Sequence, residues 1–187
     1  MPARSALTPA LLGVTLMFAA LLGSSVGAQQ VAPAPQTPSA NPLDAVPDKM
    51  PFDIPYGPPI SLERAAAAVA AAIAEAKKHD WKLNVAVVDS GGNLVAFQRM
   101  DGAQLASIQI SEHKARAAAT FRRETKAFEN AIQQNNFNYV MTIDGVIASR
   151  GGIPLVEGGK LIGAIGCSGG AGSQDEVACK VGAATVK

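Results

Sequence analysis

The sequence predicts an α/β sandwich in which helices flank a mainly antiparallel, five-stranded sheet. Two β-hairpins with glycine-containing turns bracket a helical middle of the chain. Strands joined by tight turns pair antiparallel, and helices must cover the apolar faces that such strands create. Because the hairpins lie far apart in the sequence, one sheet built from both is closed by distant segments, and a small-molecule cleft is a natural consequence.

The first 28 residues have the organisation of a secretory signal peptide. Arg4 supplies the positive start, residues 10–22 are uncharged and apolar, and Val26 and Ala28 occupy the positions that a signal peptidase reads. The apolar run is shorter than the ~20 residues that a membrane-spanning helix needs. We therefore predict cleavage after Ala28 and a periplasmic or secreted protein with no membrane span after cleavage; an uncleaved anchor is the alternative.

Residues 29–59 are rich in proline, with alanine, glutamine, serine and asparagine between. This composition favours extended, polyproline-like backbone that buries no core, so we predict a flexible tether. The remainder, residues 60–187, has the length of a single domain. A domain of that size can bury a core without needing a disulfide or a metal to fold.

The domain is expected to begin with an alanine-rich helix that Ser61 caps and that ends near Lys78. The strand Leu83–Asp89 is apolar on both faces, which predicts an interior strand covered on both sides. A turn containing two glycines returns the chain as the strand Leu94–Met100.

The spacing of apolar residues becomes helical after Gly102, and a polar stripe runs through Ser111–Arg116. Thr125 is expected to cap a second, shorter helix. We predict a third strand over Phe137–Ile143, where Phe, Tyr and Met alternate with polar or smaller residues. The second hairpin, Ile147–Val156 with Leu161–Cys167, and a closing helix over Gln174–Lys187 complete the domain.

Composition excludes one class of partner. The formal net charge is +1, aromatic residues make up 5% of the chain, and no long basic run is present. A nucleic-acid-binding surface needs clustered positive charge and groups that stack on bases, so nucleic acid is not an expected partner.

The two cysteines, Cys167 and Cys179, leave alternatives open. An exported chain permits a disulfide, and the closing helix should fold back over the strand that Cys167 ends. Two buried thiols packed as small hydrophobic groups are the other alternative. A two-cysteine metal site is less favoured, because no histidine or third cysteine lies nearby in the sequence.

A glycine-rich loop links the last strand to the closing helix. The backbone amides of Gly169, Gly170 and Ser173 lie near a helix N-terminus, where they can bind a carboxylate or phosphate. The spacing fits neither a Walker A loop nor a dinucleotide fingerprint. The alternative is a plain connection in which Ser173 caps the helix, and Asp175 would compete with a bound anion.

The chain has two histidines, His79 and His113. His79 suits a solvated position at a helix end. His113 lies mid-helix beside Glu112 and Lys114; it belongs either to a solvated polar face or, if that face lines a cleft, to an iron or other metal site as a neutral imidazole ligand. Nucleophilic catalysis is poorly supported, because no G-x-S-x-G elbow is present and no carboxylates are paired for acid–base work.

A series of motifs across nearly all of residues 60–187 resembles the GlcG/HbpS family, also called the haem-degrading domain family and found as the C-terminal domain of PduO-type proteins. The motifs are Val85–Leu94, Arg99–Ala103, Lys114–Phe121, Arg150–Leu155, Gly163–Gly169 and Gln174–Glu176.

The resemblance implies a profilin-like α-β-α sandwich that assembles into homo-oligomers, commonly octamers. It also implies a tetrapyrrole ligand, haem before a corrinoid, with His113 as the candidate metal ligand and Lys114, Gly169, Gly170 and Ser173 as candidate contacts. Two positions depart from the family pattern: Asn93 stands where some members carry histidine, and Cys167 replaces the usual aliphatic residue.

These observations together predict an exported, oligomeric haem- or tetrapyrrole-binding protein that serves in sensing, storage or scavenging and is not primarily an enzyme. The first alternative is an enzyme that acts on a small carboxylate metabolite, bound at the glycine-rich loop, or that degrades haem. The second is a purely structural or interaction oligomer.

Overall fold

The computed structural model describes residues 41–186, so the predicted signal peptide, residues 29–40 of the predicted tether and Lys187 lie outside the described residues. The chain divides into two compact units, Met1–Val46 and Pro47–Lys187. Of the first unit, the described residues contain one short 3-10 helix, η1 (Pro42–Asp44). None of the helices within residues 41–186 has both the length and the apolar character that crossing a membrane requires.

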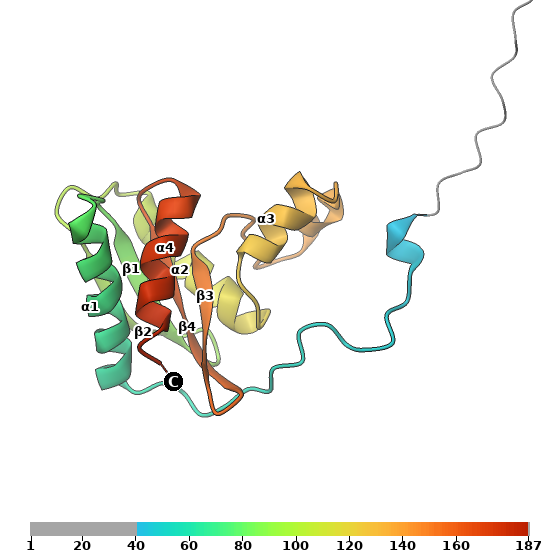
Figure 1. Cartoon of the computed structure of the whole chain (residues 1–187), viewed down its shortest axis with the longest axis horizontal. Helices are drawn as coiled ribbons and strands as arrows, with labels where there is room; N and C mark the ends of the chain where they lie inside the picture. The colour runs from blue at the N-terminus through green and yellow to red at the C-terminus, as the bar shows by residue number, and fades with distance from the viewer. Residues whose placement is uncertain (1–40, 187) are drawn as a thin grey trace, which may run out of the picture. The chain divides into compact units, whose positions relative to one another are not determined.

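The second unit is built on a four-stranded antiparallel sheet with the strand order β2-β1-β4-β3 (Figure 1). The first hairpin is β1 (Asn84–Asp89) with β2 (Leu94–Arg99), and the second is β3 (Gly152–Glu157) with β4 (Lys160–Ser168). β1 pairs with β4 along its whole length. The predicted sheet, closed by two distant hairpins with the first strand inside it, is therefore confirmed.

The prediction of a strand over Phe137–Ile143 is wrong, and the sheet has four strands rather than five. Asn138–Thr142 forms a 3-10 helix, η2, in which the Val140 N–H donates to the Phe137 carbonyl at 3.1 Å. Alternating apolar side chains predict a strand only where a neighbouring strand supplies backbone partners. Here the alternating large side chains do not form the buried face of a strand, since Val140 is the one buried residue of η2.

Helices cover both faces of the sheet (Figure 1). α1 (Leu62–Lys78) and α4 (Gly172–Ala183) pack on one face, and α2 (Ser107–Thr120) packs on the other. The short α3 (Lys126–Gln133) follows α2. The predicted cap of α1 is confirmed, since the Ser61 hydroxyl accepts a hydrogen bond from the Arg64 amide.

Small residues allow α2 to lie close to the sheet. Its buried face is largely alanine, and Gly166 of β4 lies directly beneath it. A Cβ atom at Gly166 would collide with the backbone carbonyl oxygen of Ser111. The glycine is therefore required by the close approach of α2 to the sheet.

The segment before α1 extends the sheet. Leu161 donates its N–H to the Pro55 carbonyl at 2.8 Å and accepts from the Gly57 N–H at 2.7 Å. Tyr56 thereby forms a parallel bridge with Leu161. β1 ends at Asp89, opposite Gly163, so this segment occupies the position beside β4 that β1 leaves free.

Candidate functional site

The outer side of α2 borders an open hollow of about 420 Å³, lined by Gln109, Glu112, His113, Arg116 and Gly145. α2 supplies all of these residues except Gly145, which lies in the connection between η2 and β3. The hollow therefore forms where that connection passes the polar stripe that the sequence predicts. His113 is half-buried in it.

The imidazole of His113 is held by the backbone. Its Nε2 atom lies 3.2 Å from the Gly145 carbonyl oxygen. A carbonyl can only accept, so Nε2 is the donor of this contact; in the neutral form of the ring, Nδ1 then keeps its lone pair. Histidines that bind metals are commonly oriented in this way, by a hydrogen bond from the other ring nitrogen to a carbonyl. The His113 ring is therefore held by a contact of the kind that orients many metal-binding histidines.

A metal held by protein side chains alone does not fit this position. Within residues 41–186, no three His, Cys, Asp or Glu side chains gather into a group that could hold a metal ion. A metal that brings most of its own ligands, as in a metal-containing macrocycle, needs only one imidazole from the protein. The donor set around His113 suits that kind of group.

A basic side chain of the hollow also contacts the first hairpin. The segment that leads to Gly145 exposes three large apolar residues, although none of them is part of the lining: Tyr139 (50%), Met141 (67%) and Ile143 (40%). On α2, Arg116 is exposed, and its Nε donates to the Gly92 carbonyl at 3.3 Å. This places the turn of the first hairpin, which carries Asn93, next to the hollow.

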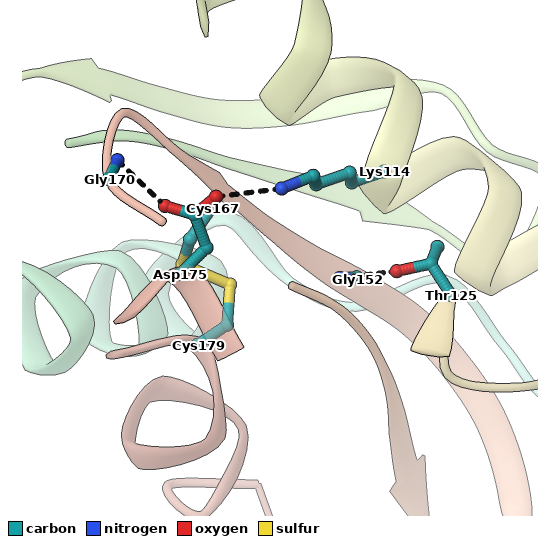
Figure 2. The surroundings of a disulfide bond; sticks show 7 residues. All are labelled: Lys114, Thr125, Gly152, Cys167, Gly170, Asp175 and Cys179. Atoms are coloured by element: carbon teal, nitrogen blue, oxygen red, sulfur yellow. Dashed lines mark hydrogen bonds and ion pairs between the residues drawn. A yellow bond between two sulfur atoms is a disulfide. The ribbon is translucent and has the colours of Figure 1, made fainter. Parts of the chain in front are cut away.

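Lys114 lies on the opposite, buried side of α2 (Figure 2). Its Nζ forms an ion pair of 2.8 Å with Asp175 Oδ2, and the two side chains are 1% and 3% exposed. The second oxygen, Asp175 Oδ1, accepts from the Gly170 N–H at 3.1 Å. Burial raises the pKa of the Asp175 carboxyl, whereas Lys114 and the amides of Gly170 and Gly169 oppose that rise.

The structure thus brings Lys114, Gly169 and Gly170 together around a carboxylate that the chain itself supplies. An external anion would have to replace Asp175 to reach the Gly170 amide. Ser173 lies elsewhere: it is exposed and borders a separate hollow of about 500 Å³ that Arg150 also lines. It is not the N-cap of α4, a position that Ala171 occupies, so the prediction that Ser173 caps this helix is wrong.

A disulfide joins Cys167 at the end of β4 to Cys179 in α4 (Figure 2). The two Cα atoms are 5.7 Å apart, and both residues are fully buried. Of the alternatives that the sequence left open, the disulfide is the one present. It ties α4 to the sheet close to the Lys114–Asp175 pair.

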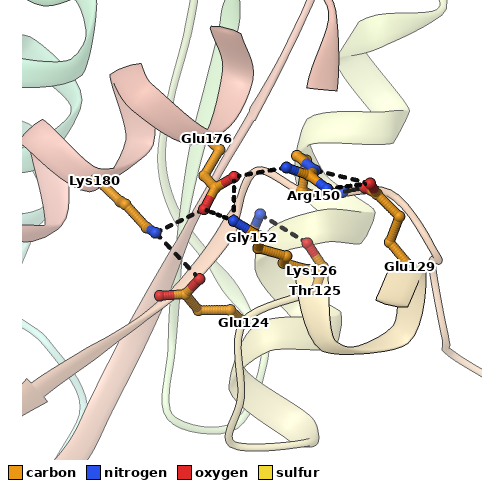
Figure 3. Close-up of polar contacts among 8 residues, drawn as sticks. All are labelled: Glu124, Thr125, Lys126, Glu129, Arg150, Gly152, Glu176 and Lys180. Carbon is orange, nitrogen blue, oxygen red and sulfur yellow. Dashed lines mark hydrogen bonds and ion pairs between the residues drawn. The ribbon is translucent and has the colours of Figure 1, made fainter. Parts of the chain in front are cut away.

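A second charged cluster surrounds Arg150 (Figure 3). Arg150 contacts the Glu129 carboxylate through Nη2 at 2.6 Å and Nε at 2.8 Å. It also reaches Glu176, which pairs in turn with Lys126 and Lys180. The cluster connects α3, the start of β3 and α4, so the charge of Arg150 is already balanced by two carboxylates of the chain.

This cluster predicts acid sensitivity. Hydrogen bonds from Arg150 hold the pKa of Glu129 below its ordinary value of 4.5. A lowered pKa contributes stability that is present above pH 4.5 and is lost as the pH falls through the lowered value. Replacing Arg150 with Met should therefore cost about 1–2 kcal/mol of unfolding free energy near neutral pH and less near about pH 3. Urea titrations at the two pH values measure both effects.

The matched control is Arg64→Met, which breaks the more exposed pair with Glu157. An exposed pair contributes about 0–1 kcal/mol. An equal loss in the Arg150 and Arg64 variants, or a loss from Arg150→Met that does not shrink in acid, would contradict the prediction.

With this geometry established, the comparisons with known proteins decide the family. Residues 60–184 match the family described as Haem degrading protein HbpS-like. The chain belongs to this HbpS-like family. The resemblance predicted from the sequence motifs is thereby confirmed.

Individual relatives agree. Protein GlcG of Escherichia coli (strain K12) is 40% identical over 109 residues, which cover 58% of this chain and 81% of GlcG. A double mutant of Streptomyces reticuli HbpS superimposes with a TM-score of 0.65 at 28% identity, covering 80% of this chain and 99% of HbpS. A structure described as a PduOC:Heme complex has a TM-score of 0.63 at 25% identity, covering 69% and 96% of the two chains.

Within this HbpS-like chain, the sequence singled out His113 as a candidate ligand but gave no indication of the groups that surround it. Nothing in the sequence identifies the Gly145 carbonyl as a partner of His113, because every residue has a backbone carbonyl. The burial of Lys114 did have a signal: Ser107, Ser111, Lys114 and Ala118 recur at helical spacing, and all four are buried. A lysine on an otherwise small, buried stripe predicts a buried partner, which is Asp175.

Proposed function

We propose that this HbpS-like protein binds haem, or a related metal tetrapyrrole, at the hollow on α2, with His113 as the axial ligand. The proposal depends on one observation above all: the Gly145 carbonyl orients the His113 ring and leaves Nδ1 free to coordinate. Haem brings its own ring nitrogens to the iron, so a single imidazole is sufficient on this side.

The other groups near the hollow suit the rest of the ligand. Arg116 lines the hollow and can pair with a carboxylate such as a propionate. Lys114, which the sequence also suggested, is engaged by Asp175 and would not take part. A relative is described as a heme complex, which supports the same class of ligand.

The protein is further proposed to act outside the cytoplasm as a homo-oligomer in haem sensing, storage or scavenging. The predicted signal peptide and the disulfide between Cys167 and Cys179 support export, because disulfides persist in oxidising compartments. An open hollow can contact only one face of a flat macrocycle. A neighbouring copy that covers the other face would account for the family's oligomers.

Hemin titration of the mature chain tests the proposal. Wild-type protein should give a saturable shift of the Soret band, and His113→Ala should weaken binding by at least about tenfold or abolish the shift. His79→Ala is the matched control, because His79 lies at the end of α1 and is expected to leave the spectrum unchanged. Cobalamin, titrated in parallel, separates a haem site from a corrinoid site. A spectrum of free hemin, or an unaffected His113→Ala variant, would refute the proposal.

A further inference from the structure

The two edges of the sheet differ in whether they can accept another strand. At the β3 edge, Gly152 donates its N–H to the Thr125 hydroxyl at 2.9 Å and accepts from the Thr125 N–H at 3.0 Å. These groups point away from β4. Backbone groups of every second residue in a strand face the same side, so the Pro154 nitrogen also points away from β4. Proline has no N–H to offer a further strand. The β3 edge is therefore closed.

The β2 edge is open. The Met100 N–H donates to the Leu83 carbonyl at 3.0 Å, so Met100 faces β1. Alternation then directs the N–H and C=O groups of Phe97 and Arg99 outward. Within the described residues, no hydrogen bond reaches these outward groups. Leu94–Arg99 also lacks proline and lysine, two residues with which proteins commonly block an exposed edge.

A basic hollow lies at the end of this open edge. Its volume is about 390 Å³, and its lining includes Lys77 of α1, Lys82 before β1 and Arg99 of β2. Within residues 47–186, Lys82 pairs with Asp80, whereas Lys77 and Arg99 form no ion pair. Asp101 is the one carboxylate in the lining, and Ile73 and Met100 add apolar surface. The hollow therefore has unbalanced positive charge.

We propose that the β2 edge binds an extended peptide segment as an added strand, with an acidic side chain of that peptide over the basic hollow. Backbone hydrogen bonds to the outward groups of Phe97 and Arg99 would provide affinity, and the carboxylate would provide specificity. A second copy of β2 is a poorer occupant, since Leu94–Arg99 contains no acidic residue to balance Lys77 and Arg99. This surface does not involve His113, so the inference is independent of the proposed haem site.

Selection from a random eight-residue peptide library on the immobilised mature chain tests the proposal. The enriched peptides should carry Asp or Glu at one position within a run of β-branched or aromatic residues. For a selected peptide, exchanging the acidic residue for its amide should weaken binding about tenfold. The double variant Lys77→Gln/Arg99→Gln should cause a similar loss, whereas Lys160→Gln, at an exposed lysine in the β3–β4 hairpin, should cause none.

Two further measurements test the edge itself. Two N-methylated versions of a selected peptide should be compared, one modified at its odd-numbered residues and one at its even-numbered residues. One of the two should fail to bind, because it lacks the N–H groups that face β2. The variant Phe97→Pro should act like Pro154 on the opposite edge and block the peptide without changing the oligomeric mass. The proposal is overturned if no peptide is enriched, if the enriched peptides lack an acidic position, or if Phe97→Pro alters the mass measured by light scattering, which would show that a second copy occupies the edge.

Discussion

Replacing Lys114 with Met should lower the free energy of unfolding by about 3–5 kcal/mol, because it leaves Asp175 buried without its partner. Both side chains are almost fully buried, and the remaining partners of the Asp175 carboxylate are backbone amides of the glycine-rich loop, among them that of Gly170 at 3.1 Å. Urea unfolding of the variant and the wild type at neutral pH measures the loss.

The pH dependence of the Lys114→Met variant gives a second test. Burial already raises the pKa of Asp175 above its ordinary 3.8, and loss of the cation should raise it further. A carboxyl whose pKa is raised by folding contributes stability when it is protonated and loses it as the pH rises through the raised value. The variant should therefore become more stable, relative to wild type, as the pH is lowered.

The double variant Lys114→Met/Asp175→Leu is the matched control for the buried pair. Replacing both charges with apolar groups removes the unpaired carboxylate, so most of the stability should return. Lys160→Met, at an exposed position, should have little effect. If Lys114→Met were no more damaging than Lys160→Met, the ion pair would have no structural role.

Removal of the disulfide should cost about 2–4 kcal/mol. The bond closes a short loop, with a sequence separation of 12, and connects the end of β4 to α4. The double variant Cys167→Ala/Cys179→Ala loses this constraint on the unfolded chain without burying a new polar group. Its unfolding free energy, compared with that of the oxidised wild type, measures the contribution.

The wild-type protein with its disulfide reduced is the comparison for the double cysteine variant. Reduced protein and the double variant should unfold at similar denaturant concentrations, both below the oxidised wild type. Thiol labelling gives a second readout: the oxidised protein should react only after unfolding and reduction, because both cysteines are buried and joined in a disulfide. Unchanged stability after reduction would contradict the expectation.

The fold was largely predictable because the sequence patterns that indicate it, turns and apolar periodicity, span only a few residues each. Glycine turns identified both hairpins, and the apolar character of both faces of Asn84–Asp89 placed that strand inside the sheet. The wrong prediction of a strand over Phe137–Ile143 also came from relying on a local pattern. Alternation is a property of the segment alone, whereas a strand also needs a neighbour with free backbone groups, and none of the four strands offers one there.

The candidate site was only partly predictable. His113 was identifiable because histidines are rare in this chain and it lies on a polar stripe. Its tautomer depends on a carbonyl 32 residues away, in a connection whose path no local pattern specifies. Lys114 and Asp175 looked like ordinary charged helix residues, and their separation of 61 residues hid the pair.

By itself, the sequence determined the family, the two hairpins and the candidate ligand His113, because turns, periodicity and motifs are local properties of the chain. Only the tertiary structure decided which charges are buried, which cysteine alternative holds and which sheet edge stays open. Each of these features arises from contacts between segments that are distant in sequence. Such contacts determine the desolvation of Lys114, the distance between Cys167 and Cys179, and the partners available to β2.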